Sequence, residues 1–430
     1  MNGYQRQQAA TLQERLDEPV RWIHIVAGPR RVGKTTLVRY VLNELPPQRS
    51  LYVSAEQTEG MEYAPSLVPS SDAIVQTVYS ATGSKADAAW LIRQWQEARL
   101  LASRLDVPFI FAIDEVQKIP RWSETVKGLW DADRAAGLQM HVILLGSSPL
   151  LVQDGLSESL MGRFEPIRMG HWSFAEMHAA FGLSLDEYIY FGGYPEPFGS
   201  GLYRNEARWR SFVADSLIEP SIDKDVRALN RVDRPALLKQ LFWLGCNYSG
   251  QILALDNMAQ NLREKNEGSE AHTGTVAKYL DLLGKAGLVA GLKKYSGSML
   301  RQRTSSPKLQ ALNNALMAVA SGYDFAAARA DRSFWGRMVE SAVGAHLHNS
   351  SDPSMLAYWR KGKLEVDFVL FRDRRITAIE VKSGGAGRGM PGLNAFSAQY
   401  PDCRRLVVGE DGIPLVEFLS QPAEHWLSES

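Results

Sequence analysis

The amino-acid sequence predicts an α/β protein of several domains, whose first part is built on a mostly parallel sheet with helices on both faces. Short apolar runs alternate with helix-length amphipathic segments up to about residue 170, which is the pattern of parallel strands joined by crossover helices. Strand-like runs return in residues 311–430, in the order helix, three strands, helix, strand. These observations predict one sheet near each end of the chain.

The length of 430 residues is too large for one ordinary domain. We divide the chain where the pattern changes. The expected parts are a sheet-containing core, a helical lid-like segment, a segment of helices with a hairpin, and a second α/β domain. They cover residues 1–172, 173–234, 235–310 and 311–430.

Bulk composition restricts the functional classes. The 48 Lys and Arg residues equal the 48 Asp and Glu residues, so binding to nucleic acid would need a local basic patch. Cys246 and Cys403 lie far apart, which fits a reducing cytoplasm and argues against a disulfide scaffold. The chain has no apolar run of ~18 residues and no apolar core in its N-terminal segment. We therefore expect a cytoplasmic protein without a membrane partner.

The predicted core contains five strands. They lie near residues 22–27, 51–54, 109–113, 141–145 and 165–168, and each is a short apolar run typical of a strand that is buried on both faces. A helix is predicted over residues 34–45, because apolar residues recur on one helical face. Residues 60–85 contain Pro65, Pro69 and several Ser and Gly residues, which indicates a long surface loop.

The turn between the first strand and this helix carries a phosphate-binding pattern. In "GPRRVGKTT", Gly28, Gly33, Lys34 and Thr35 fit G-x-x-x-x-G-K-[ST]. The glycines let backbone amides curl around phosphates, the lysine reaches the β- and γ-phosphates, and the hydroxyl ligates Mg²⁺. The expected cofactors are ATP and Mg²⁺, with Lys34 also acting in catalysis, and the alternative is a chance match in a tight turn. The expected nucleotide contacts are Gly28, Pro29, Arg30, Arg31, Val32, Gly33, Lys34, Thr35 and Thr36.

Two adjacent acids end the third strand, in "FIFAIDEVQ". In P-loop NTPases a second parallel strand ends beside the phosphate loop, and its acid completes the magnesium shell. Asp114 suits that metal-binding role together with Thr35. Glu115 is placed to polarise the attacking water and is the expected catalytic residue. The alternative is a pair of solvated acids at a strand end.

Two further positions are candidates for the same site. The strand 141–145 is followed by "GSS", in which Ser147 resembles the sensor position of AAA+ proteins that contacts the γ-phosphate; a plain Ser-rich turn is the alternative. Arg163 is a candidate finger that stabilises transition-state charge, either within the chain or across the interface of a homo-oligomer. A surface arginine with a structural role is the alternative.

Residues 235–310 follow a winged-helix pattern. "HTGTVAKYLDLLGKAGLVAGLKKYSG" predicts a helix that begins near Thr273, then a strand and a Lys-rich turn. Basic residues on this helix and in or near the wing make DNA a candidate partner through phosphate contacts. These residues are Lys278, Lys293, Lys294, Arg301 and Arg303. The alternative is a winged helix that serves only in protein packing.

The second α/β domain carries another group of acids, and its order of elements is that of the PD-(D/E)xK nuclease fold. Glu380 and Lys382 are two residues apart in one strand, so both point to one face, and Asp367 arrives from the neighbouring strand. With Glu340 from the preceding helix, the three carboxylates predict a second Mg²⁺ site. Lys382 would orient or deprotonate a water for phosphodiester attack, so the expected catalytic set is Asp367, Glu380 and Lys382. The alternative is a scaffold that has lost activity.

The order of six motifs resembles a large bacterial and archaeal family of predicted AAA+-type ATPases, whose C-terminal half is a domain of unknown function. The motifs are "GPRRVGKTTL", "IDEVQKIPRW", "LLGSSPLL", "SLMGRF", "FGGYPEP" and "KLEVDFVL…AIEVKSG". The resemblance covers nearly the whole chain. It implies a nucleotide site more directly than a physiological purpose. The chain departs from the family at Arg31, where Gln is frequent, and at residues 224–226, where Arg-Asp-Ile is usual.

Three hypotheses for function follow from these patterns. In the first, the ATPase loads or gates a C-terminal nuclease while the winged helix holds DNA. In the second, the chain is an interaction protein that is controlled by ATP binding and slow hydrolysis, and its nuclease-like domain only binds. In the third, the chain is a DNA-binding regulator without nuclease chemistry. The first depends on the complete set Glu340, Asp367, Glu380 and Lys382.

Overall fold

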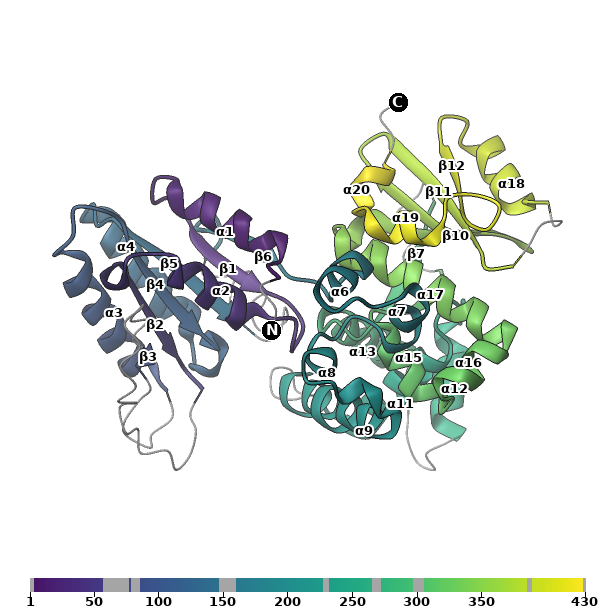
Figure 1. The fold of residues 1–430 in the computed structure, drawn as a ribbon, viewed down its shortest axis with the longest axis horizontal. Helices are drawn as coiled ribbons and strands as arrows, with labels where there is room; N and C mark the ends of the chain where they lie inside the picture. Colours follow the sequence, from purple (N-terminus) through teal and green to yellow (C-terminus); the bar gives the residue numbers. More distant parts are fainter. Residues whose placement is uncertain are drawn as a thin grey trace. The chain divides into compact units, whose positions relative to one another are not determined.

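The chain folds into two compact units. The computed structural model describes residues 4–56, 77–78, 86–146, 160–226, 232–264, 272–296, 305–384 and 389–427. The first unit is Gln5–Met169, and the second is Gly170–Ser430 together with the N-terminal residues up to Tyr4 (Figure 1). The sequence-based boundary after residue 172 lies close to this division. The three parts expected beyond it belong to one unit, because they share contacts with one another.

The first unit contains a six-stranded sheet in the order β3-β2-β4-β5-β1-β6. All of its strand pairs are parallel. The strands are β1 (Ile23–Ala27), β2 (Ser50–Ser54), β3 (Thr77–Val78), β4 (Phe109–Asp114), β5 (Met140–Gly146) and β6 (Phe164–Arg168). The five predicted strands are present, and β3 is a sixth, within the stretch expected to be a loop. The rest of that stretch, residues 60–76 and 79–85, lies outside the described residues.

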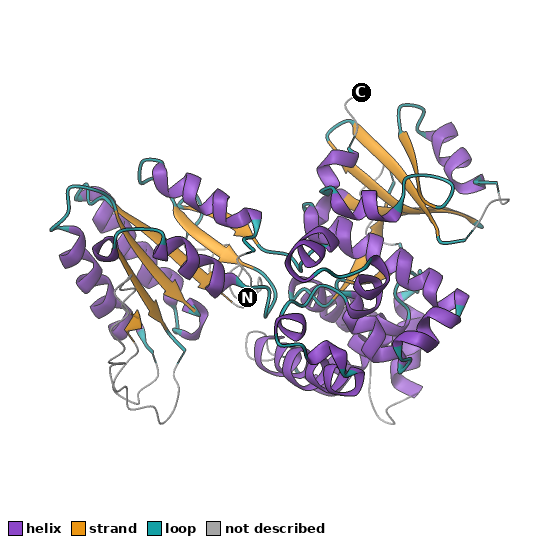
Figure 2. Cartoon of the chain, viewed as in Figure 1, coloured by secondary structure: helices purple, strands orange, loops and turns teal. Residues whose placement is uncertain are grey.

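Helices cover both faces of this sheet, as the apolar strands require (Figure 2). They are α1 (Gln7–Asp17), α2 (Lys34–Asn43), α3 (Ala88–Ala102) and α4 (Trp122–Ala135). One core joins the sheet to α3 and α4 through residues such as Trp95 and Trp130. The other core joins the opposite face to α1 and α2 through residues such as Leu12 and Val38. The helix predicted over residues 34–45 is α2, which begins at the predicted residue.

The helical part of the second unit begins with two capped helices. Ser173 and Ser184 each form a capping box, with Glu176 and Glu187 respectively, and so fix the first turns of α6 and α7. The helices here are α6 (Phe174–Phe181), α7 (Leu185–Phe191), α8 (Glu196–Gly199), α9 (Glu206–Ser211), α11 (Pro235–Asn247), α12 (Leu255–Glu264), α13 (Thr273–Lys285), α15 (Asn314–Ser321), α16 (Phe325–Ala330) and α17 (Arg332–Ser350). Two π-helical segments, Phe212–Ile218 and Ser221–Val226, follow α9.

The second unit also contains a six-stranded sheet, in the order β12-β11-β10-β9-β7-β8. Its strands are β7 (Val289–Lys294), β8 (Lys308–Ala311), β9 (Leu356–Lys361), β10 (Leu364–Arg372), β11 (Arg375–Lys382) and β12 (Arg404–Gly409), with helices α18 (Pro391–Gln399), α19 (Leu415–Ser420) and α20 (Ala423–Trp426). β7 pairs with β8 along its first half and with β9 at its end. The hairpin β7–β8 therefore belongs to the C-terminal sheet. The sequence analysis had placed residues 235–310 and 311–430 in separate domains.

Buried asparagines connect the helical part to the C-terminal part. The side-chain amide of Asn314 donates to the carbonyls of Ile189 in α7 and Met338 in α17, both at 2.8 Å. Asn313 accepts from the backbone amide of Gly193 at 3.1 Å. These bonds cross between segments that the sequence analysis placed in separate domains, and they explain why residues 170–430 form one unit.

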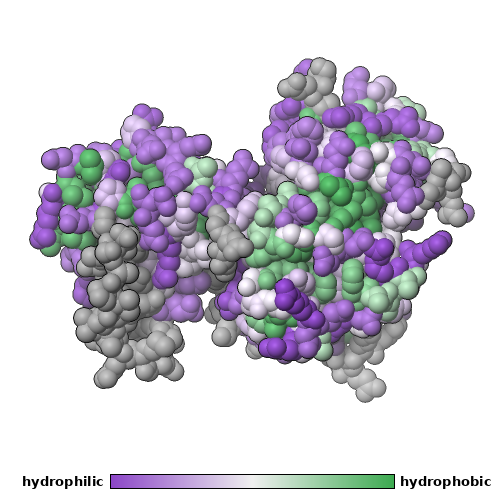
Figure 3. All heavy atoms as spheres, in the orientation of Figure 1, coloured by the Kyte–Doolittle hydropathy of each residue, from purple (hydrophilic) through white to green (hydrophobic). Residues whose placement is uncertain are grey.

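No helix in the described ranges is long and apolar enough to cross a bilayer. Hydrophilic residues are spread over the visible face of each unit, among smaller hydrophobic areas (Figure 3).

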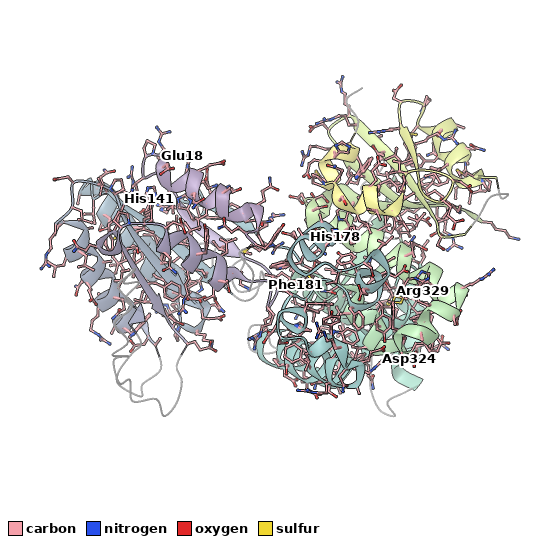
Figure 4. The ribbon with its side chains drawn as sticks, viewed as in Figure 1. Glu18, His141, His178, Phe181, Asp324 and Arg329 are labelled. Atoms are coloured by element: carbon pink, nitrogen blue, oxygen red, sulfur yellow. The ribbon has the colours of Figure 1, made fainter. Side chains whose placement is uncertain are left out.

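A buried pair of histidines lies in the first unit. His24 of β1 and His141 of β5 are 3% and 1% exposed, and their ring centroids are 5.7 Å apart (Figure 4 labels His141). None of their four ring nitrogens has a hydrogen-bond partner among the described residues. Burial is the main cause that lowers the pKa of each histidine, and together with the charge of His141 on His24 and of Arg49 on His141 it brings both values to about 4. Both rings are therefore neutral in the folded protein near pH 7.

Lowering the pH is expected to destabilise the first unit. The folded pKa of about 4 lies below the ordinary value of 6.5, so each histidine stabilises the fold above pH 6.5, and this contribution is lost as the pH falls toward 4. The loss is about 2 kcal/mol for each histidine between neutral pH and pH 5. Thermal unfolding of wild type and of His24→Leu/His141→Leu at both pH values measures it.

The double variant should show a shallower pH dependence than wild type. His425→Gln is the matched control, because His425 is exposed in α20 and should leave the pH dependence unchanged. Equal pH dependence in the double variant and wild type would contradict this assignment.

Candidate functional site

The loop between β1 and α2 has a strained and closely packed path. Arg31 and Gly33 have φ angles of 61° and 94°, and Gly33 is the residue at which α2 is capped. A Cβ atom at Gly28 would lie 2.0 Å from the carbonyl oxygen of Met169. Only glycine fits at residue 28, and the left-handed backbone at residue 33 favours glycine. The two glycines of the motif therefore shape the loop for different reasons.

Lys34 is the first residue of α2, and its side chain folds back over the loop. Its ammonium donates to the carbonyls of Gly28 at 2.9 Å and Pro29 at 2.7 Å. The residue is 7% exposed. A phosphate held by the loop amides would lie within reach of the same ammonium, because the loop surrounds it. Of the other expected contacts, Val32 is buried, Arg30 is half-buried, and Arg31 and Thr36 are exposed.

Asp114 receives three hydrogen bonds at the carboxyl end of β4. The hydroxyl of Thr35 donates to its Oδ2 at 2.8 Å, and the backbone amide of Glu115 donates to its Oδ1 at 2.8 Å. The buried hydroxyl of Tyr52 in β2 also donates to Oδ2. Burial and the charge of Asp114 raise the pKa of Tyr52 well above its ordinary value, so the phenol remains a donor.

The contact between Thr35 and Asp114 brings together two hard oxygen donors. Such donors fit Mg²⁺, which prefers carboxylate, hydroxyl and phosphate oxygens. In the sheet, β5 lies between β1 and β4. The two side chains still meet, because α2 leads Thr35 across the carboxyl end of the sheet.

Glu115 follows in a left-handed conformation, with a φ angle of 52°. Its carboxylate accepts a hydrogen bond from the side-chain amide of Gln117. Burial raises the pKa of Glu115, and the charge of Asp114 raises it further. A carboxylate in this setting has a higher affinity for a proton than an exposed one, which suits a group that polarises water. Sequence reasoning did not single out Gln117, although it lies in the quoted motif "IDEVQKIP".

The structure describes only one of the two remaining candidates. Ser147 is outside the described residues, and β5 ends just before it at Gly146. The carbonyl of Arg163 accepts from the amide of Ile23, at the start of β1, and its guanidinium pairs with Asp131 at 2.7 Å. Arg163 therefore lies at the opposite edge of the sheet from the phosphate loop. This position does not serve a finger that acts within its own first unit.

The segment of residues 235–310, called the hairpin module below, places its basic residues in different settings. Lys278 is exposed on α13, and Lys293 is exposed near the end of β7. Lys294 pairs in register with Tyr358 of β9 and is half-buried. Arg301 and Arg303 lie outside the described residues.

The four predicted residues of the C-terminal centre do gather in one region. Asp367 accepts from the amide of Val381 at 2.8 Å, and the ammonium of Lys382 lies 2.5 Å from Glu380. Burial raises the pKa of Glu380, and Asp367 raises it further. Burial also raises the pKa of Glu340 to about 7, against the opposing charge of a lysine beside it.

That lysine is Lys308, at the start of β8, which the sequence analysis did not consider. Its ammonium lies 2.7 Å from Glu340, 3.4 Å from Glu365 and 3.6 Å from Asp367. Among the described residues, no group of three or more His, Cys, Asp or Glu side chains is arranged to hold a metal ion. Two of the three carboxylates of the expected metal centre, Glu340 and Asp367, instead have the ammonium of Lys308 beside them.

Comparison with protein families supports the reading of the first unit. Residues 21–178 match the family model described as an AAA domain. Residues 182–326 and 335–416 match two models described as domains of unknown function, DUF8612 and DUF4143. Among proteins of curated function, none matches the chain.

Solved structures give a likeness of fold. The chain is 18% identical to a Walker-type ATPase of Pyrococcus abyssi, with a TM-score of 0.50 over 74% of this chain and 95% of that chain. The ORC1 protein of Aeropyrum pernix in complex with DNA is 14% identical, with a TM-score of 0.30 over 74% and 92% of the two chains. The Thermotoga maritima RuvB Holliday junction branch migration motor is 17% identical, with a TM-score of 0.29 over 66% and 86%. Only the first score supports a shared fold.

The parallel sheet, its phosphate loop and the acids at the end of β4 define the first unit as a P-loop ATPase domain of the AAA type. The two domains of unknown function follow it in the second unit. The chain therefore carries an AAA domain in its first unit, followed by two domains of unknown function.

Removing the hydroxyl of Tyr52 should weaken the metal-binding side of the site. Tyr52→Phe keeps the ring in its buried place and deletes one donor to Asp114. Groups that orient a metal ligand typically contribute about 10-fold to metal affinity, so the Mg²⁺ concentration for half-maximal ATPase activity should rise by about that factor. Tyr248→Phe, at a tyrosine that is 40% exposed in the second unit, is the control. An unchanged Mg²⁺ requirement in Tyr52→Phe would contradict this role.

Proposed function

We propose that this protein is a Mg²⁺-dependent, ATP-hydrolysing switch that acts on DNA through its hairpin module. The observation that carries the nucleotide part is the 2.8 Å contact between Thr35 and Asp114, with Glu115 beside it. All three residues lie in the first unit, so this part of the proposal does not depend on the second unit.

Each residue of the site has a distinct task in this proposal. The amides of the loop from Gly28 to Gly33 bind the phosphates, and Lys34 exchanges its loop carbonyls for phosphate oxygens. Thr35 and Asp114 would hold Mg²⁺, which neutralises charge on the β- and γ-phosphates when bound. Glu115 orients the attacking water and accepts its proton.

The DNA part of the proposal comes from the order of elements in the second unit. Helices α11, α12 and α13 precede the antiparallel hairpin β7–β8. A single antiparallel bridge joins Ile252, in the connection between α11 and α12, to Lys308 of β8. This order is typical of a winged helix, with α13 as the helix that would approach the major groove. Exposed Lys278 on α13 supports phosphate contact, whereas packing alone remains the competing role.

The geometry of the C-terminal cluster favours a switch over a nuclease. Residues that should hold a catalytic metal are paired with Lys308 instead. This pairing supports a role in which the C-terminal domain does not cut nucleic acid. Of the three hypotheses, the second and third agree with this arrangement.

Oligomeric state and location complete the proposal. Because Arg163 lies far from its own phosphate loop, a finger role would require a neighbouring subunit of a homo-oligomer. Cys246 and Cys403 are both free thiols, which supports a reducing cytoplasmic location.

Glu115→Gln is expected to bind ATP with near wild-type affinity and to hydrolyse it at least about 100-fold more slowly, because only the group that activates water is lost. Binding is measured with a fluorescent ATP analogue, and turnover by phosphate release. Lys34→Ala is the contrasting variant and should lose binding itself. Unchanged turnover in Glu115→Gln would refute the catalytic assignment.

Binding of DNA should weaken steeply as salt concentration rises, because phosphate contacts release counterions. Neutralising Lys278 and Lys293 together, as Lys278→Gln/Lys293→Gln, should reduce the slope of log affinity against log salt by about 2. Fluorescence anisotropy with a labelled duplex measures this slope. The control is Lys363→Gln, at an exposed lysine outside the module. Affinity that is absent, or that does not depend on salt, would leave the module with a packing role.

A further inference from the structure

Lys308 is a fully buried cation in the second unit. Its side chain is 0% exposed, and it contacts carboxylates of Glu340 in α17 and of Glu365 and Asp367 in β10. It also lies 3.2 Å from the backbone carbonyl of Asp367 and 4.9 Å from the ring centroid of Phe368. Oxygen atoms from three acids and one carbonyl therefore converge on a single ammonium group.

A lysine is rarely buried in this way without a strong electrostatic reason. Burial alone would lower the pKa of Lys308, but the charges of Glu340, Asp367 and Glu365 outweigh burial and raise the pKa above its ordinary value. The group is therefore charged in the folded protein. A cation held by several carboxylates and a carbonyl is the arrangement that metal sites use with hard divalent ions.

We propose that the Lys308 ammonium is the resident cation of this carboxylate cluster and that it excludes divalent metal ions from it. Two cations cannot share the same carboxylates at these distances without strong repulsion. Two further oxygens are also engaged, since Asp367 accepts from the amide of Val381 and Glu380 Oε1 pairs with Lys382, whereas Glu380 Oε2 is buried without a hydrogen-bond partner among the described residues. The cluster has the residues of a metal centre and the electrostatics of an ion-paired core.

The origin of the lysine gives the cluster a second property. Glu340, Glu365 and Asp367 belong to α17 and β10, whereas Lys308 belongs to β8 of the hairpin. Asp367 also lies within the irregular register between Val366 and Val369, where β10 bulges against β9. A bulge can redirect a side chain out of the regular pleat. The occupancy of the cluster therefore depends on where the hairpin holds Lys308, and not on the carboxylates alone.

The test is Mn²⁺ binding to the full-length protein without nucleotide. Free Mn²⁺ is measured by electron paramagnetic resonance during titration. Wild type should show no binding that depends on Asp367. Lys308→Met, which keeps the length of the side chain and removes its charge, should gain a site that binds Mn²⁺ at least 10-fold more tightly than any site of wild type. Lys308→Met/Asp367→Asn should lose that gain.

Two controls separate the removed charge from its location. Lys308→Arg keeps a cation in the cluster and should bind no Mn²⁺ there. Lys363→Met removes a lysine charge from an exposed position in the same domain and should behave as wild type.

If wild type binds Mn²⁺ and Asp367→Asn abolishes that binding, the proposal is overturned. This comparison decides the question even if Lys308→Met does not fold. A folded Lys308→Met protein that gains no Mn²⁺ site would also overturn it. The assay contains no ATP and no DNA, so its outcome is independent of the ATPase and DNA predictions.

Discussion

The hydrogen bond from Thr35 to Asp114 is the constraint on which the nucleotide site depends. It joins residues that are 79 positions apart in the chain, and it can form only if β1, β5 and β4 run parallel and end at the same edge of the sheet. Apolar residues on both faces of these strands require helices above and below. Burial of the two cores therefore also sets the position of the Thr35 and Asp114 oxygens.

The same logic explains which site residues could be predicted from sequence. Lys34, Thr35, Asp114 and Glu115 each lie next to a strand end, so their positions follow from motif spacing and sheet direction. Tyr52 and Gln117 could not be found in this way. Tyr52 reads as an ordinary apolar strand residue, and its hydrogen bond depends on β2 lying beside β4, which is a matter of strand order. Gln117 depends on the left-handed turn at Glu115.

The C-terminal domain shows the limit of residue patterns more sharply. The spacing of Glu380 and Lys382 correctly places them on one face of β11, where they pair with each other. The pattern could not show that a lysine from a separate hairpin lies among the acids. In "SPKLQALNNAL", a single lysine before an apolar run has the appearance of a solvated strand end. Its burial follows from the pairing of β7 with both β8 and β9, which is a property of the tertiary fold.

The contacts that join the parts of the second unit could not be predicted for a related reason. Composition changes near residues 235 and 310 suggested domain boundaries, but Asn314 connects α7 to α17 and the hairpin completes the C-terminal sheet. Hydrogen bonds made by a buried side-chain amide leave no signal in the local hydrophobic periodicity of the sequence. They must be satisfied inside the protein, and here the partners are carbonyls more than 20 residues away in either direction.

The shared sheet has a practical consequence for any shortened form of this protein. A fragment that begins at residue 311 would contain β9 to β12 but would lack β7 and β8. The free edge of β9 around Ala357 and Tyr358 would then present unpaired backbone groups, which promote association between copies. The acids of α17 and β10 would also face one another without their ammonium partner, and their mutual repulsion would loosen the fragment. Isolated C-terminal fragments that begin at residue 311 should therefore aggregate, whether they are expressed or made by limited proteolysis. A cut before α6 would leave this sheet whole.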